Sequence, residues 1–248
     1  MKETVLITGA SGGIGSAIAM ELASCGCDIA VHYYQAKEKA EQLKEQIISK
    51  YGVQCMTVQA DVAKEEEVDR MFDSIEAELG DVSILINNAA LDAPDLFSRK
   101  DAETFRRILD VNVVGAYSCA KRAYRSMMDR EAGKIVNIAS TNGINTYYPM
   151  CFDYDASKAA LISLTHNLAV QFAPYVNVNA VAPGFIGTEK ELEGYDEEFL
   201  KQETEKILKK RYGQPEEVAR LVRFLVSDEA SYINNTVIRI DGGQMGSV

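Results

Sequence analysis

Histidine is scarce in this 248-residue chain, and its cysteines are few and scattered. The only histidines are His32 and His166, and the five cysteines stand at positions 25, 27, 55, 119 and 151. A structural zinc site takes four such ligands in close spacing, so we expect no metal. An odd, scattered set of cysteines also argues against a disulfide framework and indicates a reducing compartment.

Positive charge is also in short supply: 26 basic residues face 37 acidic ones, for a net charge of −11. Binding of bulk nucleic acid usually needs a clustered positive surface, and an anionic membrane surface would repel the chain. No apolar run approaches the ~18–20 residues of a membrane span. The first residues, MKETVLITGASGG, show no signal-peptide pattern. We therefore predict a cytoplasmic protein with no nucleic-acid or membrane partner.

Short β-branched runs alternate with longer amphipathic segments along the whole chain. Strands are expected at 4–8, 28–33, 55–60, 82–87, 134–139, 176–181 and 236–240. Helices are expected at 13–25, 36–50, 64–79, 101–128, 155–172, 190–209 and 215–227. This alternation predicts right-handed crossovers and an α/β fold with a doubly wound parallel sheet. We see no repeat or linker, so residues 1–248 are predicted to form one Rossmann-like catalytic domain.

The stretch VLITGASGGIGSAIA places a glycine-rich turn between the first strand and the first helix. Glycines at 9, 13 and 15 let the turn tighten and let backbone N–H groups approach a pyrophosphate at the helix N-terminus. A P-loop would end in Gly-Lys-Ser/Thr, which is absent. The second strand ends in Tyr33 and Tyr34 with no carboxylate to bind a ribose 2′-hydroxyl, and Lys37 and Ser11 are available to a 2′-phosphate. NADP(H) is therefore favoured over NAD(H).

Three tyrosines have a lysine four residues later, the pairs Tyr33–Lys37, Tyr117–Lys121 and Tyr154–Lys158. A nearby cation favours the phenolate and lowers a tyrosine pKa from about 10. Only Tyr154 opens a long helix after a strand that ends in a hydroxyl, Ser140. Without further context, the alternative is an aromatic side chain that packs beside a solvated lysine.

Further motifs follow in a fixed order from residue 4 to residue 243. They are TGASGGIG, ADV at 60–62, NNAA at 87–90, VNVVGAY at 111–117, NIAS at 137–140, YDASK at 154–158 and NAVAPGFIGT at 179–188. In this order the set resembles the short-chain dehydrogenase/reductase family. Within that family it most resembles the 3-oxoacyl-[acyl-carrier-protein] reductase branch. Two departures are Ala90, where the family has glycine, and Gly12, where many NADP-using relatives carry arginine.

The resemblance implies a role for each matched residue. Tyr154 would be the general acid/base and Ser140 would orient the carbonyl. Lys158 would bind the nicotinamide ribose and depress the Tyr154 pKa, and Asn112 would hold a proton-relay water. Asp61 and Val62 would lie by the adenine, and Asn88 would brace the cofactor side of the sheet. Together with the glycine turn, the expected cofactor contacts are Gly9, Ser11, Gly13, Ile14, Gly15, Tyr33, Tyr34, Asp61, Val62, Asn88, Tyr154, Lys158, Pro183, Gly184, Ile186 and Thr188.

The activity expected from this resemblance is the NADP(H)-dependent interconversion of a small-molecule ketone and a secondary alcohol. Two alternatives remain open: an NAD-dependent dehydrogenase of a sugar, polyol or steroid alcohol, and a non-catalytic dinucleotide-sensing module. Residues 190–209 are expected to form a substrate lid. The family implies a homotetramer built on helices 101–128 and 155–172. Docking of an acyl carrier protein is doubtful, because that acidic partner needs a basic surface and this chain is acidic.

Overall fold

The computed structural model describes residues 3–194 and 196–245. Within them, strands form one parallel sheet in the order β3-β2-β1-β4-β5-β6-β7. The strands are β1 Thr4–Ile7, β2 Asp28–Tyr33, β3 Cys55–Gln59, β4 Ile84–Asn87, β5 Gly133–Ile138, β6 Val176–Pro183 and β7 Val237–Ile240. The predicted doubly wound parallel sheet is confirmed.

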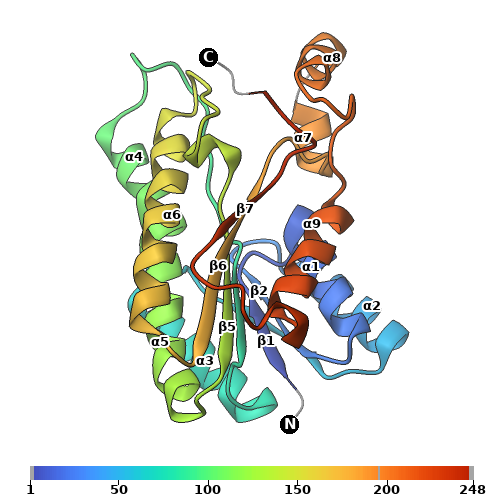
Figure 1. Cartoon of the computed structure of the whole chain (residues 1–248), viewed down its shortest axis with the longest axis vertical. Helices are drawn as coiled ribbons and strands as arrows, with labels where there is room; N and C mark the ends of the chain where they lie inside the picture. The colour runs from blue at the N-terminus through green and yellow to red at the C-terminus, as the bar shows by residue number, and fades with distance from the viewer. Residues whose placement is uncertain (1–2, 195, 246–248) are drawn as a thin grey trace.

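Both faces of the central strands are covered, which explains their unbroken apolar sequences. Val5 and Ile7 of β1 pack in one hydrophobic cluster, and Leu6, which points the opposite way, packs in the other. Helices α1 (Gly13–Ser24), α2 (Lys37–Tyr51) and α9 (Pro215–Val226) cover the first face (Figure 1). The second face is covered by α3 (Glu65–Leu79), α5 (Gly115–Asp129) and α6 (Phe152–Gln171).

One predicted helix is interrupted in the structure. The segment expected as a single helix over 101–128 consists of α4 (Ala102–Leu109), a π-helical segment η1 (Asp110–Val114) and then α5. Two contacts accompany the break. The side chain of Asn112 bonds the main chain of Leu91, and a Cβ on Gly115 would lie 2.7 Å from Val62 Cγ2. A π-turn of this kind is rare and is found mostly at functional sites.

The predicted lid helix over 190–209 is also divided, into α7 (Glu189–Gly194) and α8 (Glu197–Glu205). The Asp196 side chain caps α8 by accepting a hydrogen bond of 2.8 Å from the Phe199 N–H, which starts a separate helix. Helix α6 begins at Phe152, three residues before the predicted start at 155. No helix in the described ranges is both long and apolar enough to cross a bilayer.

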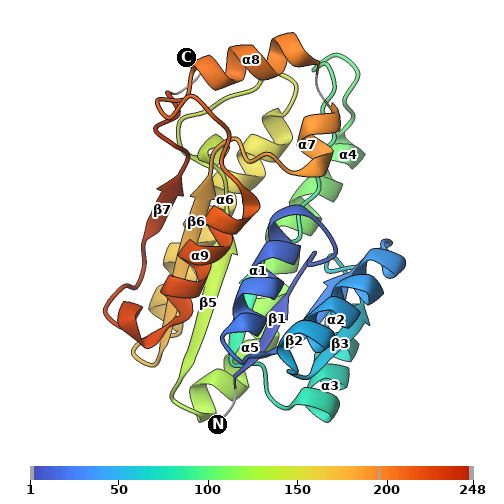
Figure 2. The same cartoon turned by 90° about the vertical axis from the view of Figure 1, so that its right-hand side faces the viewer.

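Strand β1 pairs with β2 on one side and with β4 on the other, so the direction in which strands are added to the sheet reverses at β1. Parallel strands meet with all carboxyl ends at one edge, and ligands bind where the strand order reverses. The loops after β1, β4, β5 and β6 therefore gather at the upper edge of the sheet, beneath α7 and α8 (Figure 2).

Candidate active site

The turn between β1 and α1 has the shape of a phosphate cradle. Gly9 and Gly13 have positive φ angles of +64° and +50°, which only glycine adopts at low cost. A Cβ on Gly15 would lie 2.6 Å from the Gly9 carbonyl oxygen. The N-cap Gly12 offers no side-chain bond, and the first turn of α1 has no acidic residue. The free N–H groups and dipole of this helix end fit a pyrophosphate.

Two side chains hold this turn against its neighbours. Asn88 donates from Nδ2 to the carbonyl oxygens of Thr8 (2.9 Å) and Gly9 (3.0 Å), which matches its expected bracing position. His32 accepts a hydrogen bond of 2.9 Å at Nδ1 from the Gly9 N–H, so its proton lies on Nε2, 3.0 Å from the Ala60 carbonyl oxygen. Burial lowers the pKa of His32 to about 4. Sequence reasoning missed this neutral histidine, because its partners lie far along the chain.

The expected adenine end contains an arginine that the motifs did not predict. The buried carboxylate of Asp61 forms an ion pair of 3.0 Å with Arg107 of α4. The same guanidinium lies over the Tyr34 ring at 5.9 Å from its centroid. Tyr34 is half exposed, whereas Tyr33 is buried in the hydrophobic core. Of the two tyrosines expected beside the coenzyme, Tyr34 is the one at the surface.

The structure brings Ser140, Tyr154 and Lys158 together at the carboxyl end of β5. A side-chain hydrogen bond joins Ser140 and Tyr154, and the Ser140 hydroxyl also donates to Asn142 Oδ1 at 3.2 Å. Lys158 is buried and donates to the Ile138 carbonyl oxygen at 2.8 Å, with its Nζ 5.3 Å from the centroid of the Tyr154 ring. These three residues therefore form one cluster of polar side chains, as the resemblance implied.

Burial controls the ionisation of this cluster. Desolvation raises the pKa of the Tyr154 phenol well above 10, and the nearby Asp92 carboxylate raises it further. Desolvation also lowers the pKa of Lys158 to about 8. In the chain alone the net shift of the Tyr154 pKa is upward, opposite to the expected depression, because desolvation of the phenol is the largest cause. A phenol with a raised pKa is fully protonated at neutral pH and is able to donate its proton.

The π-helical segment places Asn112 behind the cluster. Its Nδ2 donates to the Leu91 carbonyl oxygen and to Ser157 Oγ, both at 2.9 Å, and its Oδ1 accepts from the Leu91 N–H at 2.7 Å. Ser157 in turn donates to the Tyr154 carbonyl oxygen at 2.7 Å. Asn112 thus ties the loop after β4 to the helix that carries Tyr154. The water expected at Asn112 stays a prediction.

The segment after β6 lies beside the glycine turn, as the cofactor assignment requires. A Cβ on Gly13 would meet Thr188 Cγ2 at 3.1 Å, so these two predicted contacts are neighbours. Pro183 ends β6, and Gly184 lies so close to Gln244 that a Cβ there would be 2.5 Å from Oε1. Ile186 packs into the hydrophobic core. The cradle and this segment together fit a dinucleotide.

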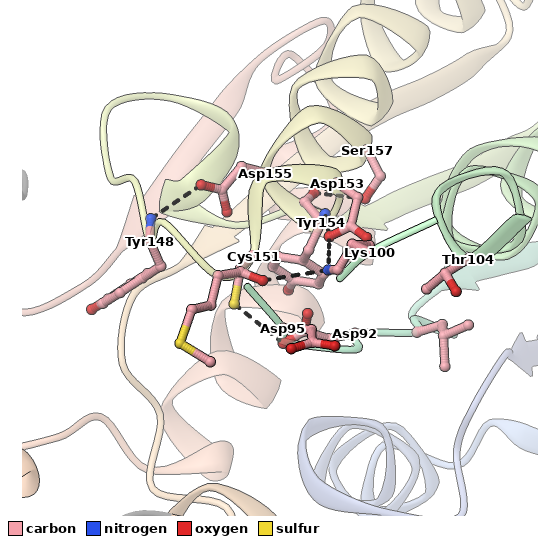
Figure 3. A network of polar contacts seen from close by, with 12 residues as sticks. Asp92, Asp95, Lys100, Thr104, Tyr148, Cys151, Asp153, Tyr154, Asp155 and Ser157 are labelled. Atoms are coloured by element: carbon pink, nitrogen blue, oxygen red, sulfur yellow. Dashed lines mark hydrogen bonds and ion pairs between the residues drawn. The ribbon is translucent and has the colours of Figure 1, made fainter. Parts of the chain in front are cut away.

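Two loops and α8 are joined on the other side of the site. Cys151 Sγ lies 3.8 Å from Asp92 Oδ2, which joins the segment before α6 to the loop after β4 (Figure 3). Tyr148 donates its hydroxyl to Glu203 Oε2 of α8 at 2.7 Å. This contact ties α8 to the loop before α6.

Comparisons with known proteins agree with this geometry. A family model described as Enoyl-(Acyl carrier protein) reductase matches residues 9–245. The 3-oxoacyl-[acyl-carrier-protein] reductase FabG of Staphylococcus epidermidis is 36% identical over 98% of this chain and 99% of its own length. The chain belongs to the short-chain dehydrogenase/reductase family. It is an oxidoreductase that interconverts an alcohol and a carbonyl group. The enzymes of this family use nicotinamide dinucleotides as coenzymes.

Other members of the short-chain dehydrogenase/reductase family show the range of substrates. The 3beta-hydroxysteroid dehydrogenase 1 of Eggerthella lenta is 36% identical over 97% of this chain and 93% of its own length. The crystal structure of YwfH, an NADPH-dependent reductase involved in bacilysin biosynthesis, superposes with a TM-score of 0.92 at 32% identity and covers both chains fully.

Proposed function

We propose that this protein is an NADPH-dependent reductase that converts a small-molecule ketone to a secondary alcohol. The observation that carries the proposal is the Ser140–Tyr154–Lys158 cluster at the strand ends beside the glycine cradle. The bound coenzyme would supply the hydride that adds to the carbonyl carbon. Tyr154 donates its phenolic proton to the carbonyl oxygen, and Ser140 orients that oxygen by a hydrogen bond.

Lys158 supports this proton transfer in two ways. With a pKa of about 8, it is mostly protonated at neutral pH, so its charge stabilises the phenolate that Tyr154 becomes after donation. Its position near the ring also suits a hydrogen bond to the nicotinamide ribose. We propose that Asn112 holds the water that returns a proton to Tyr154.

The choice of NADPH rests on the end of β2 and on Arg107. No carboxylate stands at Tyr33 or Tyr34 to repel a 2′-phosphate. The Arg107 guanidinium pairs with Asp61 and lies over Tyr34, and its side chain is about one-third exposed, so its remaining N–H groups are proposed to contact a phosphate oxygen. The NADPH-dependent structural relative supports the same choice.

A free small molecule is a better fit than an acyl carrier protein. The basic residues of α5 that would dock an acidic domain are already paired with acids. Lys121 contacts Glu65 at 2.6 Å, and Arg122 contacts Asp73 and Glu76 at 2.7 and 2.8 Å. The likeness to 3-oxoacyl-[acyl-carrier-protein] reductases therefore extends to the chemistry and leaves carrier-protein docking doubtful.

Oxidation of a steroid alcohol is the second candidate. Phe97, Met150 and Leu192, on the loops and lid around the site, expose 80%, 45% and 42% of their surfaces, which suits a large apolar substrate, and one relative is named as a hydroxysteroid dehydrogenase. A dinucleotide sensor without turnover is disfavoured, because sensing needs no proton donor.

The proposal extends to the lid, the assembly and the location. Helices α7 and α8 are proposed to cover the substrate. Val114, Tyr117, Tyr124 and Val170 are exposed on η1, α5 and α6, so we propose that these helices pair between subunits of a homotetramer, which analytical ultracentrifugation tests. Ala120, Ala123 and Met127 of α5 face the core instead. The cytoplasmic location stays a prediction.

The deciding experiment is a substrate panel with both coenzymes. The purified chain is supplied with NADPH or NADH and with acyl, cyclic and steroid ketones, and coenzyme oxidation is followed by absorbance. We expect ketone-dependent oxidation that is faster with NADPH. Faster turnover of a steroid alcohol with NAD⁺ would favour the second candidate, and tight coenzyme binding with no turnover would favour the sensor.

A further inference from the structure

A fully buried ion pair lies beside the catalytic tyrosine. Lys100, at the end of the loop after β4, contacts Asp153 Oδ1 at 2.7 Å, and the two side chains are 2% and 0% exposed (Figure 3). Lysine and aspartate are almost never buried unless they are paired. Taking two charges out of water is costly, and an apolar replacement is often no less stable. The pair therefore calls for an explanation other than stability.

The pair closes a set of contacts between the loop after β4 and the start of α6. Lys100 Nζ also donates to the Met150 carbonyl oxygen at 3.3 Å, and the Asp95 N–H donates to the same oxygen at 3.1 Å. The contact between Cys151 and Asp92 lies further along the same two segments. The loop and the residues before α6 are thus joined at several points along their length.

Aromatic rings pack around this junction. Lys100 Nζ lies over the Phe152 ring, 4.9 Å from its centroid, and the centroids of Phe97 and Phe105 lie 5.3 and 6.3 Å from that of Phe152. An ion pair that water cannot reach is screened far less than a surface pair. Its geometry is therefore held more rigidly than that of the exposed pairs on α3 and α5.

Asp153 carries this rigidity to the reacting group. Its Oδ1 accepts a second hydrogen bond, of 2.9 Å, from the backbone N–H of Tyr154. We propose that Lys100 and Asp153 are positioning residues that lock the first turn of α6 to the loop after β4 and thereby fix the Tyr154 phenol for proton transfer. The proposal rests on the function proposed above, because it concerns the catalytic role of Tyr154.

Single and double substitutions test the pair. Lys100→Met leaves a buried carboxylate and Asp153→Asn leaves a buried ammonium, whereas the double variant removes both charges. Each single variant should lower kcat for ketone reduction by about tenfold to a hundredfold, since small misplacements of a reacting group cost this much. The double variant should recover most of that loss. The dissociation constant for NADPH should change by no more than about twofold, because the cradle lies elsewhere.

A matched control is the exposed pair Lys121–Glu65, whose separation is 2.6 Å. Lys121→Met should leave kcat unchanged. Hydrogen exchange adds a readout that needs no turnover: the peptide 150–158 should exchange faster in both single variants and return toward the parent rate in the double variant. If one single variant does not fold, the other and the double variant decide.

The outcomes separate the positioning role from the proposed function. If the parent reduces a ketone and both single variants keep its kcat and its exchange rates, the positioning role is refuted and the function stands. Equal losses of kcat and NADPH affinity would also refute it, because they would show general damage to the fold. If the parent reduces no ketone, the function fails, and the exchange rates alone judge whether the pair holds the start of α6.

Discussion

The coenzyme half and the catalytic half of the site are built by different means. The turn after β1 is shaped by main-chain geometry, through glycines with positive φ angles and close approaches to the backbone. His32, the buried histidine that bonds this turn, is held neutral. The region around α6 relies instead on buried ionisable groups, among them Lys100, Asp153, Tyr154 and Lys158. The first half is therefore sensitive to side-chain volume and the second to charge.

The largest expected effect separates chemistry from binding. Tyr154→Phe removes the proton donor and leaves the glycine cradle intact, so kcat for ketone reduction should fall by about 10²–10⁴-fold. The dissociation constant for NADPH, measured by quenching of tyrosine fluorescence or by calorimetry, should stay near the parent value. A variant that reduces the ketone at the parent rate would remove Tyr154 from the mechanism.

A single added methyl group should weaken coenzyme binding at the glycine turn. Gly15→Ala places a Cβ 2.6 Å from both Asn88 Nδ2 and the Gly9 carbonyl oxygen, so the turn must deform and NADPH affinity should fall by about a hundredfold, or about 3 kcal/mol. Gly12→Ala is the matched control, since a Cβ there has no neighbour within 4 Å. Similar calorimetric dissociation constants for the two variants would show that the cradle tolerates side chains.

His32 makes the stability of the coenzyme half depend on pH. Its folded pKa of about 4 lies below the unfolded value of 6.5, so below pH 6.5 the unfolded chain binds the extra proton first. The stability that neutral His32 contributes is complete above pH 6.5 and is lost as the pH falls toward 4. Between pH 6.5 and 5 the loss should be about 2 kcal/mol.

His32→Asn preserves an acceptor for Gly9 and a donor for Ala60 without a titrating ring. Denaturant unfolding at pH 7 and pH 5 should therefore show a smaller loss of stability in this variant than in the parent. An equal loss in both chains would mean that other groups cause the acid sensitivity and that His32 does not.

The smallest expected effect concerns the outer surface of α5. A 3-oxoacyl group on an acyl carrier protein should be reduced with a kcat/KM no higher than the same group on N-acetylcysteamine, because the basic residues of α5 are paired with acids. A carrier-protein preference of about tenfold or more that disappears with added salt would contradict this and would reveal a basic docking surface.

The alternation of strands and helices was sufficient to predict the sheet. The grouping of Ser140, Tyr154 and Lys158 followed from the resemblance to the family, because the spacing of tyrosine and lysine alone also fits two other pairs in the chain. Partners separated by long stretches of chain were not predictable in this way. Gly9 meets His32 across 23 residues, Asp61 meets Arg107 across 46, and Lys100 meets Asp153 across 53.

The break between α4 and α5 was missed for a related reason. The apolar residues from 101 to 128 follow a helical pattern on both sides of η1, and a periodic pattern does not reveal a local change in winding. The contacts of Asn112 with Leu91 and Ser157, which accompany the wider turn, come from other elements. The division of the lid, by contrast, had a local signal in the Asp196 cap that was not used.

The π-turn at Asp110–Val114 carries one residue more than a regular helix would need there. A π-turn holds its extra residue within one turn, so the helices on either side keep their faces. Deleting a single residue there would let α4 and α5 join as one regular helix, with Arg107 still directed toward Asp61 and Tyr34. The wide turn that holds the Asn112 side chain against Leu91 and Ser157 would be lost. The coenzyme end would keep its arginine, and the catalytic end would lose one of its links to the loop after β4.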